Sequence, residues 1–485
     1  MGGSRRRRAF VPAAALALAA ALIATTGFRP PSAGAPAPPS AAPGRMDEAA
    51  AAQMAARVKT EFLHAWHGYE RDAWGHDELR PLSRTPYDWY GQSLDMTPVD
   101  ALDTLVLMGL HTEADKDRQL IDRTLSFDKD VSVKVFEVTI RLLGGLLSGY
   151  ELTHDPRLLA LAEDLGTRLL PAFDSPTGLP YRFVNLRTGQ VRGVDSNPAE
   201  TGTLILEFGT LSRLTGKPVF MEKAKRALVE TFRRRSPIGL VGDGLDVVTG
   251  KWTDAGSHIS GGIDSYYEYQ VKCRLLFGDP DCGRMWRASV VAINTYLADE
   301  EHGQLWYGHA DMDTGQRTAT TYSALAAYFP AVLALSGDVA RAERLQASSF
   351  RMWNLYGIEP EVLDYRTMTV KSPAYHLRPE IVESTYYLYH FTRDPKYRAM
   401  GRTMFDDFVK YCRTPAAYAS LRSVITKQQM DEMPSYVFAE TFKYFYLLFS
   451  PPSTLDFDKV IFNTEAHPLL RHLPAALRMA SRNPS

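Results

Sequence analysis

Four acidic side chains hold nearly the same place in four copies of a repeated segment. Glu137, Glu200, Asp264 and Glu380 lie 18, 17, 15 and 14 residues before a recurring turn. Each would open a helix, where an acidic side chain interacts favourably with the helix dipole. On buried helices, however, four carboxylates are costly unless they are paired or used. Converging carboxylates can act as general acid and general base, as hydrolysis of a glycosidic bond requires.

Two arginines accompany these acids. Arg141 follows Glu137 by one helical turn, and Arg378 precedes Glu380 by two residues. A guanidinium group presents a fork of donors that suits a carboxylate or the hydroxyls of a sugar. The fourth copy of the segment carries Ala324 where the others carry an acid.

The recurring turn shows which elements must position these side chains. It reads LTHDP at 152–156, LTGKP at 214–218, FGDP at 277–280, LSGD at 335–338 and FTRDP at 391–395. The intervals between its Asp or Lys positions are 62, 62, 59 and 56 residues. A Gly or Thr would end one helix, the Asp would cap the next, and the Pro would occupy its first turn.

Apolar residues at helical spacing lie on both sides of each turn, so every copy predicts a helical hairpin. With further helical stretches at 47–70, 98–127 and 433–450, we expect an all-α fold of about fourteen helices. The helix before each turn is apolar all round, as a buried inner helix would be, and the following helix is more charged. A closed ring with inner and outer helices is therefore expected, and an open solenoid is the alternative. Strand signals are few and short and fall in the long loops.

The N-terminal region predicts transport out of the cytosol. Four arginines within 1–8 precede an apolar run to residue 28, and a Pro/Ala-rich stretch covers 29–45. We interpret 1–28 as a signal peptide or, alternatively, an uncleaved membrane anchor. A catalytic domain would cover 46–470 and a tail 471–485. An exported location is also where Cys273 and Cys282 could pair, while the odd count of three cysteines leaves at least one thiol free.

Composition and charge exclude some classes of function. The formal net charge of -1 provides no field for binding nucleic acid.

Among the seven tryptophans, Trp306 is the one expected to contact a substrate, because it falls in a loop region.

Eight segments, in order, resemble the motifs of glycoside hydrolase family 47, the class I α-mannosidases, over about residues 55–470. They are 73–83 (AWGHDELRPLS), 99–105 (VDALDTL), 136–147 (FEVTIRLLGGLL), 206–208 (LEF), 264–269 (DSYYEY), 377–384 (LRPEIVES), 439–444 (AETFKY) and 462–468 (FNTEAHP). The resemblance implies an (α/α)7 barrel and an inverting, exo-acting α-1,2-mannosidase that trims high-mannose glycans.

The same resemblance implies a role for each acidic motif residue. Glu137 would be the general acid, Glu380 the general base, and Asp264 an essential further carboxylate that has also been considered as the acid. The substrate-binding residues would be Arg141, Arg378, Glu383, Glu440 and Glu465.

A bound Ca²⁺ is also implied. Thr464 would supply its hydroxyl and carbonyl oxygens, and surrounding carboxylates would hold water ligands, because calcium prefers six to eight oxygens. His467 would support this C-terminal segment.

The chain departs from the family pattern at three positions. Ala324 replaces a histidine, Ala327 replaces a disulfide cysteine, and Gly262 replaces an arginine that makes one branch selective for a single mannose. The alternative function is therefore a mannose-glycan-binding, lectin-like protein of the same fold, with weak or altered activity. A glucan hydrolase or a helical scaffold explains fewer of the motifs.

The expected partner is a mannose-containing oligosaccharide or glycoprotein glycan, and the expected state is a monomer with a possible membrane tether.

Overall fold

A computed structural model describes residues 46–471 of the chain. The expectations for the signal or anchor, the linker, and the tail apart from residue 471 lie outside these residues. No helix within the described part is long and apolar enough to cross a membrane.

Seven inner helices form a ring in the described region, and seven outer helices each pack against one of them. The inner helices are α2 (Met96–Leu107), α5 (Gly144–Thr153), α8 (Ile205–Thr215), α10 (Asp264–Phe277), α12 (Phe329–Leu335), α14 (Glu380–Thr392) and α16 (Phe442–Phe449). The outer helices are α3 (His111–Thr124), α6 (Pro156–Leu169), α9 (Pro218–Arg233), α11 (Pro280–Ala292), α13 (Val339–Asn354), α15 (Pro395–Cys412) and α1 (Glu48–Asp72). The expected (α/α)7 barrel is confirmed.

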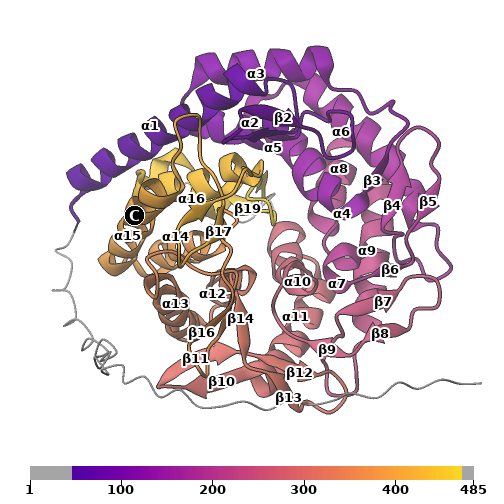
Figure 1. Cartoon of the computed structure of the whole chain (residues 1–485). Helices are drawn as coiled ribbons and strands as arrows, with labels where there is room; N and C mark the ends of the chain where they lie inside the picture. Colours follow the sequence, from indigo (N-terminus) through magenta and orange to yellow (C-terminus); the bar gives the residue numbers. More distant parts are fainter. Residues whose placement is uncertain (1–45, 472–485) are drawn as a thin grey trace, which may run out of the picture. The chain divides into compact units, whose positions relative to one another are not determined.

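The ring is closed, which excludes the open solenoid. α1, the first helix of the described residues, is the outer partner of α16, the last α-helix among them, and Figure 1 shows the indigo helix beside the yellow one. The turn that leads into α16 also contacts α2. Shorter helical turns accompany the ring: α4 (Val135–Val138), η1 (Thr139–Leu143), η2 (Leu170–Phe173), α7 (Pro198–Gly202), η3 (Ile293–Leu297), η4 (Leu325–Tyr328), η5 (Val437–Thr441), η6 (Pro452–Thr454) and η7 (Phe457–Lys459).

The five copies of the repeated turn join the inner helices α5, α8, α10, α12 and α14 to their outer partners, as their sequence predicts. The side chains of Asp155, Asp279 and Asp394 accept hydrogen bonds from backbone amides of the helices that they precede, and Pro follows each of them. The residue before the marker is left-handed in these three turns, with φ of 59° at His154, 72° at Gly278 and 54° at Arg393. The helix therefore ends at this residue, one position after the Thr in the first and last copies.

Short antiparallel strands lie in the connections between the helices and in the C-terminal hairpin. They are β1 (Glu78–Arg80), β2 (Thr85–Tyr87), β3 (Ser132–Lys134), β4 (Phe183–Asn185), β5 (Val191–Arg192), β6 (Asp195–Ser196), β7 (Gly244–Asp246), β8 (Trp252–Asp254), β9 (Gly256–Ser257), β10 (Ala298–Glu301), β11 (Gln304–Tyr307), β12 (His309–Asp311), β13 (Arg317–Ala319), β14 (Thr321–Ser323), β15 (Val362–Asp364), β16 (Thr369–Ser372), β17 (Leu421–Ser423), β18 (Gln428–Gln429), β19 (Val460–Phe462) and β20 (Pro468–Leu470).

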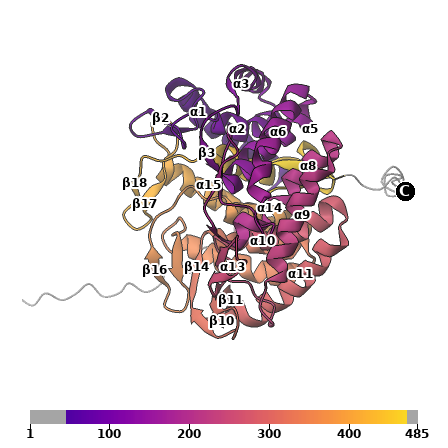
Figure 2. The same cartoon turned by 90° about the vertical axis from the view of Figure 1, so that its right-hand side faces the viewer.

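These strands fix the starts of the inner helices. β3, β6, β9 and β14 each run into an inner-helix segment, and each pairs with a strand that follows the outer helix of the same pair. This pairing fixes where these four inner-helix segments begin, and with three of them the acids Glu137, Glu200 and Asp264. In Figure 2, β14, β16, β17 and β18 lie on the left of the ring, and the yellow C-terminal segment lies toward the other side.

Candidate active site

A cavity of about 270 Å³ at the centre of the ring collects every acid and arginine, and the threonine, that the motifs assigned to the site. Its lining includes Glu137, Arg141, Asp264, Arg378, Glu380, Glu383, Glu440, Thr464 and Glu465. Glu200, the fourth acid of the repeat, also lines it. Glu137, Glu200, Asp264 and Glu380 come from four separate helices, and they meet because these helices begin at the same end of the ring.

Two of the helical turns at the cavity have π-helical hydrogen bonding. Arg141 lies in η1 and Glu440 in η5. Such turns interrupt an α-helix and are frequent at functional sites. Here η1 separates α4, which carries Glu137, from α5, and η5 precedes α16.

Asp264 and Glu380 face the cavity with carboxyls that gain protons easily. Burial raises the pKa of Asp264 to about 7, although Oδ1 accepts a hydrogen bond of 2.8 Å from the Ser265 amide. Burial also raises the pKa of Glu380 to about 7, against the opposing charge of Arg378. The buried Oε2 of Glu380 has no hydrogen-bond partner. Both groups can therefore exchange protons near neutral pH.

Glu137 lies between two cations. The Nζ atom of Lys134 is 3.3 Å from its Oε1, and the guanidinium of Arg141 is 3.3 Å from its Oε2. Lys134 also lies 3.0 Å from Glu200 Oε1, so one ammonium group connects the acids of two repeats.

The floor of the cavity carries more negative charge than nearby cations balance. Burial raises the pKa of Glu383 to about 8, against Lys272, and that of Glu465 to about 8, against Arg141. Burial and the neighbouring Glu465 raise the pKa of Glu440 well above its usual range. Carboxylates held this close repel one another, so a bound cation would stabilise them.

The β19–β20 hairpin closes this floor, and Asn463 anchors its turn. Asn463 Nδ2 donates to the Ile140 carbonyl and to Glu207 Oε1, both at 2.8 Å. Its Oδ1 accepts from the amides of Glu465 at 2.9 Å and His467 at 2.8 Å. These bonds fix the backbone of Thr464 below the cavity.

A buried ionic network holds the same hairpin from behind. Lys443 Nζ lies 2.8 Å from Asp103 Oδ1 and donates to the Ala466 carbonyl at 2.6 Å. His467 contacts Asp103 Oδ2 at 2.7 Å and Asp100 Oδ1 at 3.3 Å. Burial opposes protonation of His467, yet these two carboxylates raise its pKa to about 9. The expected support of the C-terminal segment by His467 is confirmed.

The donor set at the floor fits the calcium site that the sequence suggests. Within residues 46–471, no group of three or more His, Cys, Asp or Glu side chains is arranged to hold a metal ion directly. The expected site uses the oxygens of Thr464 directly and carboxylates through water. The unbonded Glu380 Oε2 and the raised pKa of Glu440 are consistent with carboxylates that serve such water ligands.

Several residues of the site were not singled out from the sequence. Glu268, one turn after Asp264 on α10, could have been found from its spacing. Tyr436, directly before η5, could not, since its role depends on two arginines from other helical segments, with its ring 5.5 Å from Arg141 and 6.0 Å from Arg378. Glu361 holds Arg378 through contacts of 2.7 and 3.2 Å from a distant loop that has no local signal.

Other expectations outside the core of the site have clear outcomes. Trp306 as a substrate contact is wrong, because its side chain is 0% exposed and stacks on Tyr365 at 5.4 Å. Cys273 and Cys282 form the disulfide that was considered possible, and Cys412 is free and buried. Ala324 is fully buried, so Leu325 and Tyr328 form that part of the cavity wall.

Comparisons with known proteins agree on one family. The family model of glycosyl hydrolase family 47 matches residues 61–471. Alpha-mannosidase I MNS5 of Arabidopsis thaliana is 39% identical over 448 residues, which cover 86% of this chain and 77% of that protein. The endoplasmic reticulum mannosyl-oligosaccharide 1,2-alpha-mannosidase of Homo sapiens is 36% identical, covering 85% of this chain and 63% of that protein.

A solved structure gives the same result. The alpha-1,2-mannosidase from Trichoderma reesei superposes with a TM-score of 0.81 at 28% identity and covers 87% of this chain and 99% of that one. The similarity therefore extends over the whole ring, including its closing hairpin.

Proposed function

The chain belongs to glycosyl hydrolase family 47 and is a glycoside hydrolase, and from this premise we propose an inverting, exo-acting α-1,2-mannosidase that trims terminal mannose from high-mannose glycans. One observation carries the proposal: the acids and arginines named from the motifs all line a single central cavity. A cavity of this size, closed below by a hairpin, suits one terminal sugar ring and so favours exo cleavage.

The acid and base roles follow from the surroundings of three carboxyls. Glu380 acts as general base and takes a proton from the attacking water, and the guanidinium of Arg378 favours its ionised form. Glu137 is the general acid that the motif implies. Asp264 is the rival for that role, because its pKa of about 7 lets it hold a proton at neutral pH, whereas Glu137 lies between Lys134 and Arg141.

Thr464 and the carboxylates around it would hold Ca²⁺. When bound, the ion supplies a positive charge that orients sugar hydroxyls and water. The chain's own contribution is to fix the backbone of Thr464 through Asn463 and to position Glu380, Glu383, Glu440 and Glu465 around it.

We propose that the enzyme works outside the cytosol as a monomer, exported by its N-terminal segment, with a membrane tether through the same segment as the alternative. The Cys273–Cys282 disulfide supports an oxidising compartment.

The test is hydrolysis of α-1,2-mannobiose by the purified protein, with Ca²⁺ or with a chelator, followed by NMR to identify the first anomer. Release of β-mannose that requires Ca²⁺ and is lost in Glu137→Gln is the expected result. Release of α-mannose would contradict inversion. Tight glycan binding without release by a folded, calcium-loaded protein would instead establish the lectin-like alternative.

A further inference from the structure

A hydrogen-bonded turn leads into α10 and places Asp264 at the wall of the catalytic cavity. The carbonyl of Ser260 accepts hydrogen bonds from the amides of Ile263 at 3.1 Å and Asp264 at 3.0 Å. Gly261 and Gly262, inside this turn, line the cavity together with Asp264. The position of the Asp264 carboxyl in the cavity therefore depends on where Ser260 is held.

His258 holds Ser260 through a ring nitrogen. The Ser260 amide donates to His258 Nδ1 at 3.2 Å. Because a backbone amide can only donate, Nδ1 is the unprotonated nitrogen of a neutral ring, and the ring proton is on Nε2. Nε2 lies 3.5 Å from Asp243 Oδ2, which suits a nitrogen that carries a proton. The arrangement is the histidine counterpart of an Asx turn, in which an Asn or Asp side chain accepts from the amide two residues on.

Strand pairing brings a second imidazole against the first. Ser257 on β9 pairs with Ala310 on β12, so His258 and His309 stand opposite each other at the next position of the register. Their ring centroids are 4.5 Å apart. Burial and the charges of His258 and Arg317 lower the pKa of His309 to about 4, so the neighbouring ring is neutral above this pH. The buried ring of His258 is therefore enclosed by a neutral ring and by the turn that it supports.

Two acids face His258, one outside the turn and one at its end. A Cβ atom on Gly262 would overlap Asp243 Oδ1, so a side chain at this position would displace the carboxylate that lies beside His258. At Asp264, burial raises the pKa and the charge of His258 acts against it. A proton on His258 would therefore be stabilised by Asp243. It would also turn Nδ1 from an acceptor into a donor that faces another donor.

We propose that neutral His258 is a positioning residue for Asp264, and that protonation of its Nδ1 atom at acid pH lowers catalytic activity. The inference rests on the proposed function, because it takes hydrolysis at the central cavity as the reaction that Asp264 serves. A proton from solvent binds Nδ1, and the hydrogen bond from the Ser260 amide is lost. Histidine side chains change charge between about pH 5 and 8, so acidification alone can release the turn.

The test compares three variants by the pH dependence of kcat for α-1,2-mannobiose. His258→Asn keeps an acceptor for the Ser260 amide but takes up no proton. Relative to each protein's own maximum, its kcat at about pH 5 should be about threefold or more above that of the wild type. His258→Ala removes the acceptor and should lower kcat about tenfold at every pH, more than it changes KM. Asp243→Asn removes the charge that favours the protonated ring, so its acidic limb should move to lower pH.

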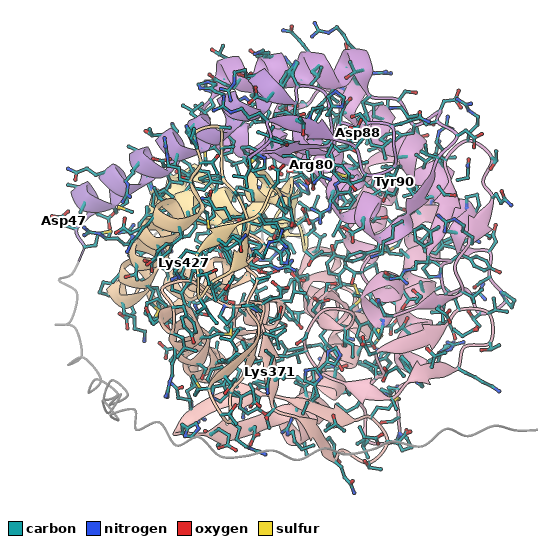
Figure 3. The ribbon with its side chains drawn as sticks, viewed as in Figure 1. Asp47, Arg80, Asp88, Tyr90, Lys371 and Lys427 are labelled. Atoms are coloured by element: carbon teal, nitrogen blue, oxygen red, sulfur yellow. A yellow bond between two sulfur atoms is a disulfide. The ribbon has the colours of Figure 1, made fainter. Side chains whose placement is uncertain are left out.

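His64→Asn is the matched control. His64 Nε2 contacts the Thr414 carbonyl at 2.9 Å, an acceptor to which a protonated ring still donates. The residue is on the outer helix α1, whose N-cap Asp47 is labelled at the left of Figure 3, whereas Figure 1 shows β9 and β12 at the lower edge of the ring in the same view. Its pH profile should match that of the wild type. Melting temperatures at each pH show whether the folded protein is being measured.

An acidic limb that His258→Asn leaves unchanged would overturn the inference, as would a loss of activity that follows unfolding. Long-range ¹H–¹⁵N NMR of histidine-labelled protein reads the ring without hydrolysis, with His258 assigned by the signal that His258→Asn removes. Nδ1 should be unprotonated at about pH 8 and should gain its proton as activity falls, and a proton on Nδ1 at about pH 8 rejects the inference.

The proposed function and the positioning role can fail separately. If the wild type hydrolyses no mannobiose, the proposed function fails, and the positioning role is judged from the carboxyl NMR signal of Asp264. That signal should respond to the titration of His258 in the wild type and lose this response in His258→Asn. The same response in both proteins would reject the role.

Discussion

Two clusters of buried charge meet at the β19–β20 hairpin, and they differ in how their charges are balanced. Behind the hairpin, Asp103 lies between Lys443 and His467, and these cations lower its pKa to about 2 despite burial. In front of it, Glu440 has no such partner, and burial and Glu465 raise its pKa. The first cluster is complete within the protein. The second contains more carboxylates than the nearby cations neutralise, which indicates a bound cation or substrate.

The largest expected effect comes from an acid in the open cluster. Glu380→Gln should lower kcat for mannobiose by about 10²–10⁴-fold, the usual contribution of general acid–base catalysis. The melting temperature should change little, because the Oε2 atom of the carboxylate that is replaced has no hydrogen-bond partner. Retained activity would show that another group activates the water.

The same acid-to-amide change in the paired cluster should destabilise the fold instead. Asp103→Asn should lower the free energy of unfolding by about 3–5 kcal/mol, because it leaves buried Lys443 without its counterion and His467 with Asp100 alone. Denaturant unfolding measures this, with Glu440→Gln as the matched control that should be neutral or stabilising. Equal losses in both variants would remove the distinction between the clusters.

The pH dependence of stability sharpens the comparison. The folded pKa of His467 is about 9 against an ordinary value of 6.5. Its protonated ring therefore contributes fully to the free energy of unfolding below pH 6.5, and this contribution disappears as pH rises through 9. Across this window the wild type should lose about 3 kcal/mol more than His467→Gln. Parallel stability curves for the two proteins between pH 6 and 9.5 would show that the folded protein does not hold this proton.

The smallest expected effect concerns the fit of the hairpin. A Cβ atom on Gly144 would lie 2.5 Å from Asn463 Nδ2, an atom already bonded to Ile140 and Glu207. Gly144→Ala should therefore destabilise by about 1–3 kcal/mol and weaken Ca²⁺ binding, because the turn must shift. The control is Gly283→Ala on α11, where the nearest atoms belong to flexible arginine side chains. Calorimetry with and without Ca²⁺ measures both quantities, and matching melting temperatures would argue against the tight fit.

The sequence predicted what repeats or motifs encode and missed what depends on distant partners. The caps at Asp155 and Asp279 and the acids at the helix starts follow from local spacing. Arg378 pairs with Glu361, and the Tyr436 ring lies between two arginines. Both arrangements depend on segments that only the folded ring brings together. Trp306 shows the same limit, because spacing in a loop does not distinguish a buried ring from one that faces a ligand.

The pairing of α1 with α16 has a consequence for synthesis. A chain emerging from the ribosome holds α1 without α16, the inner helix against which it packs, until synthesis has passed residue 449. Thr464 and Glu465 arrive later still. Fragments released early therefore lack both the contact between α1 and α16 and the cavity floor. Activity would thus indicate that a chain has been made through the β19–β20 hairpin, and the closing of the ring would coincide with the first moment at which the protein can act on a glycan.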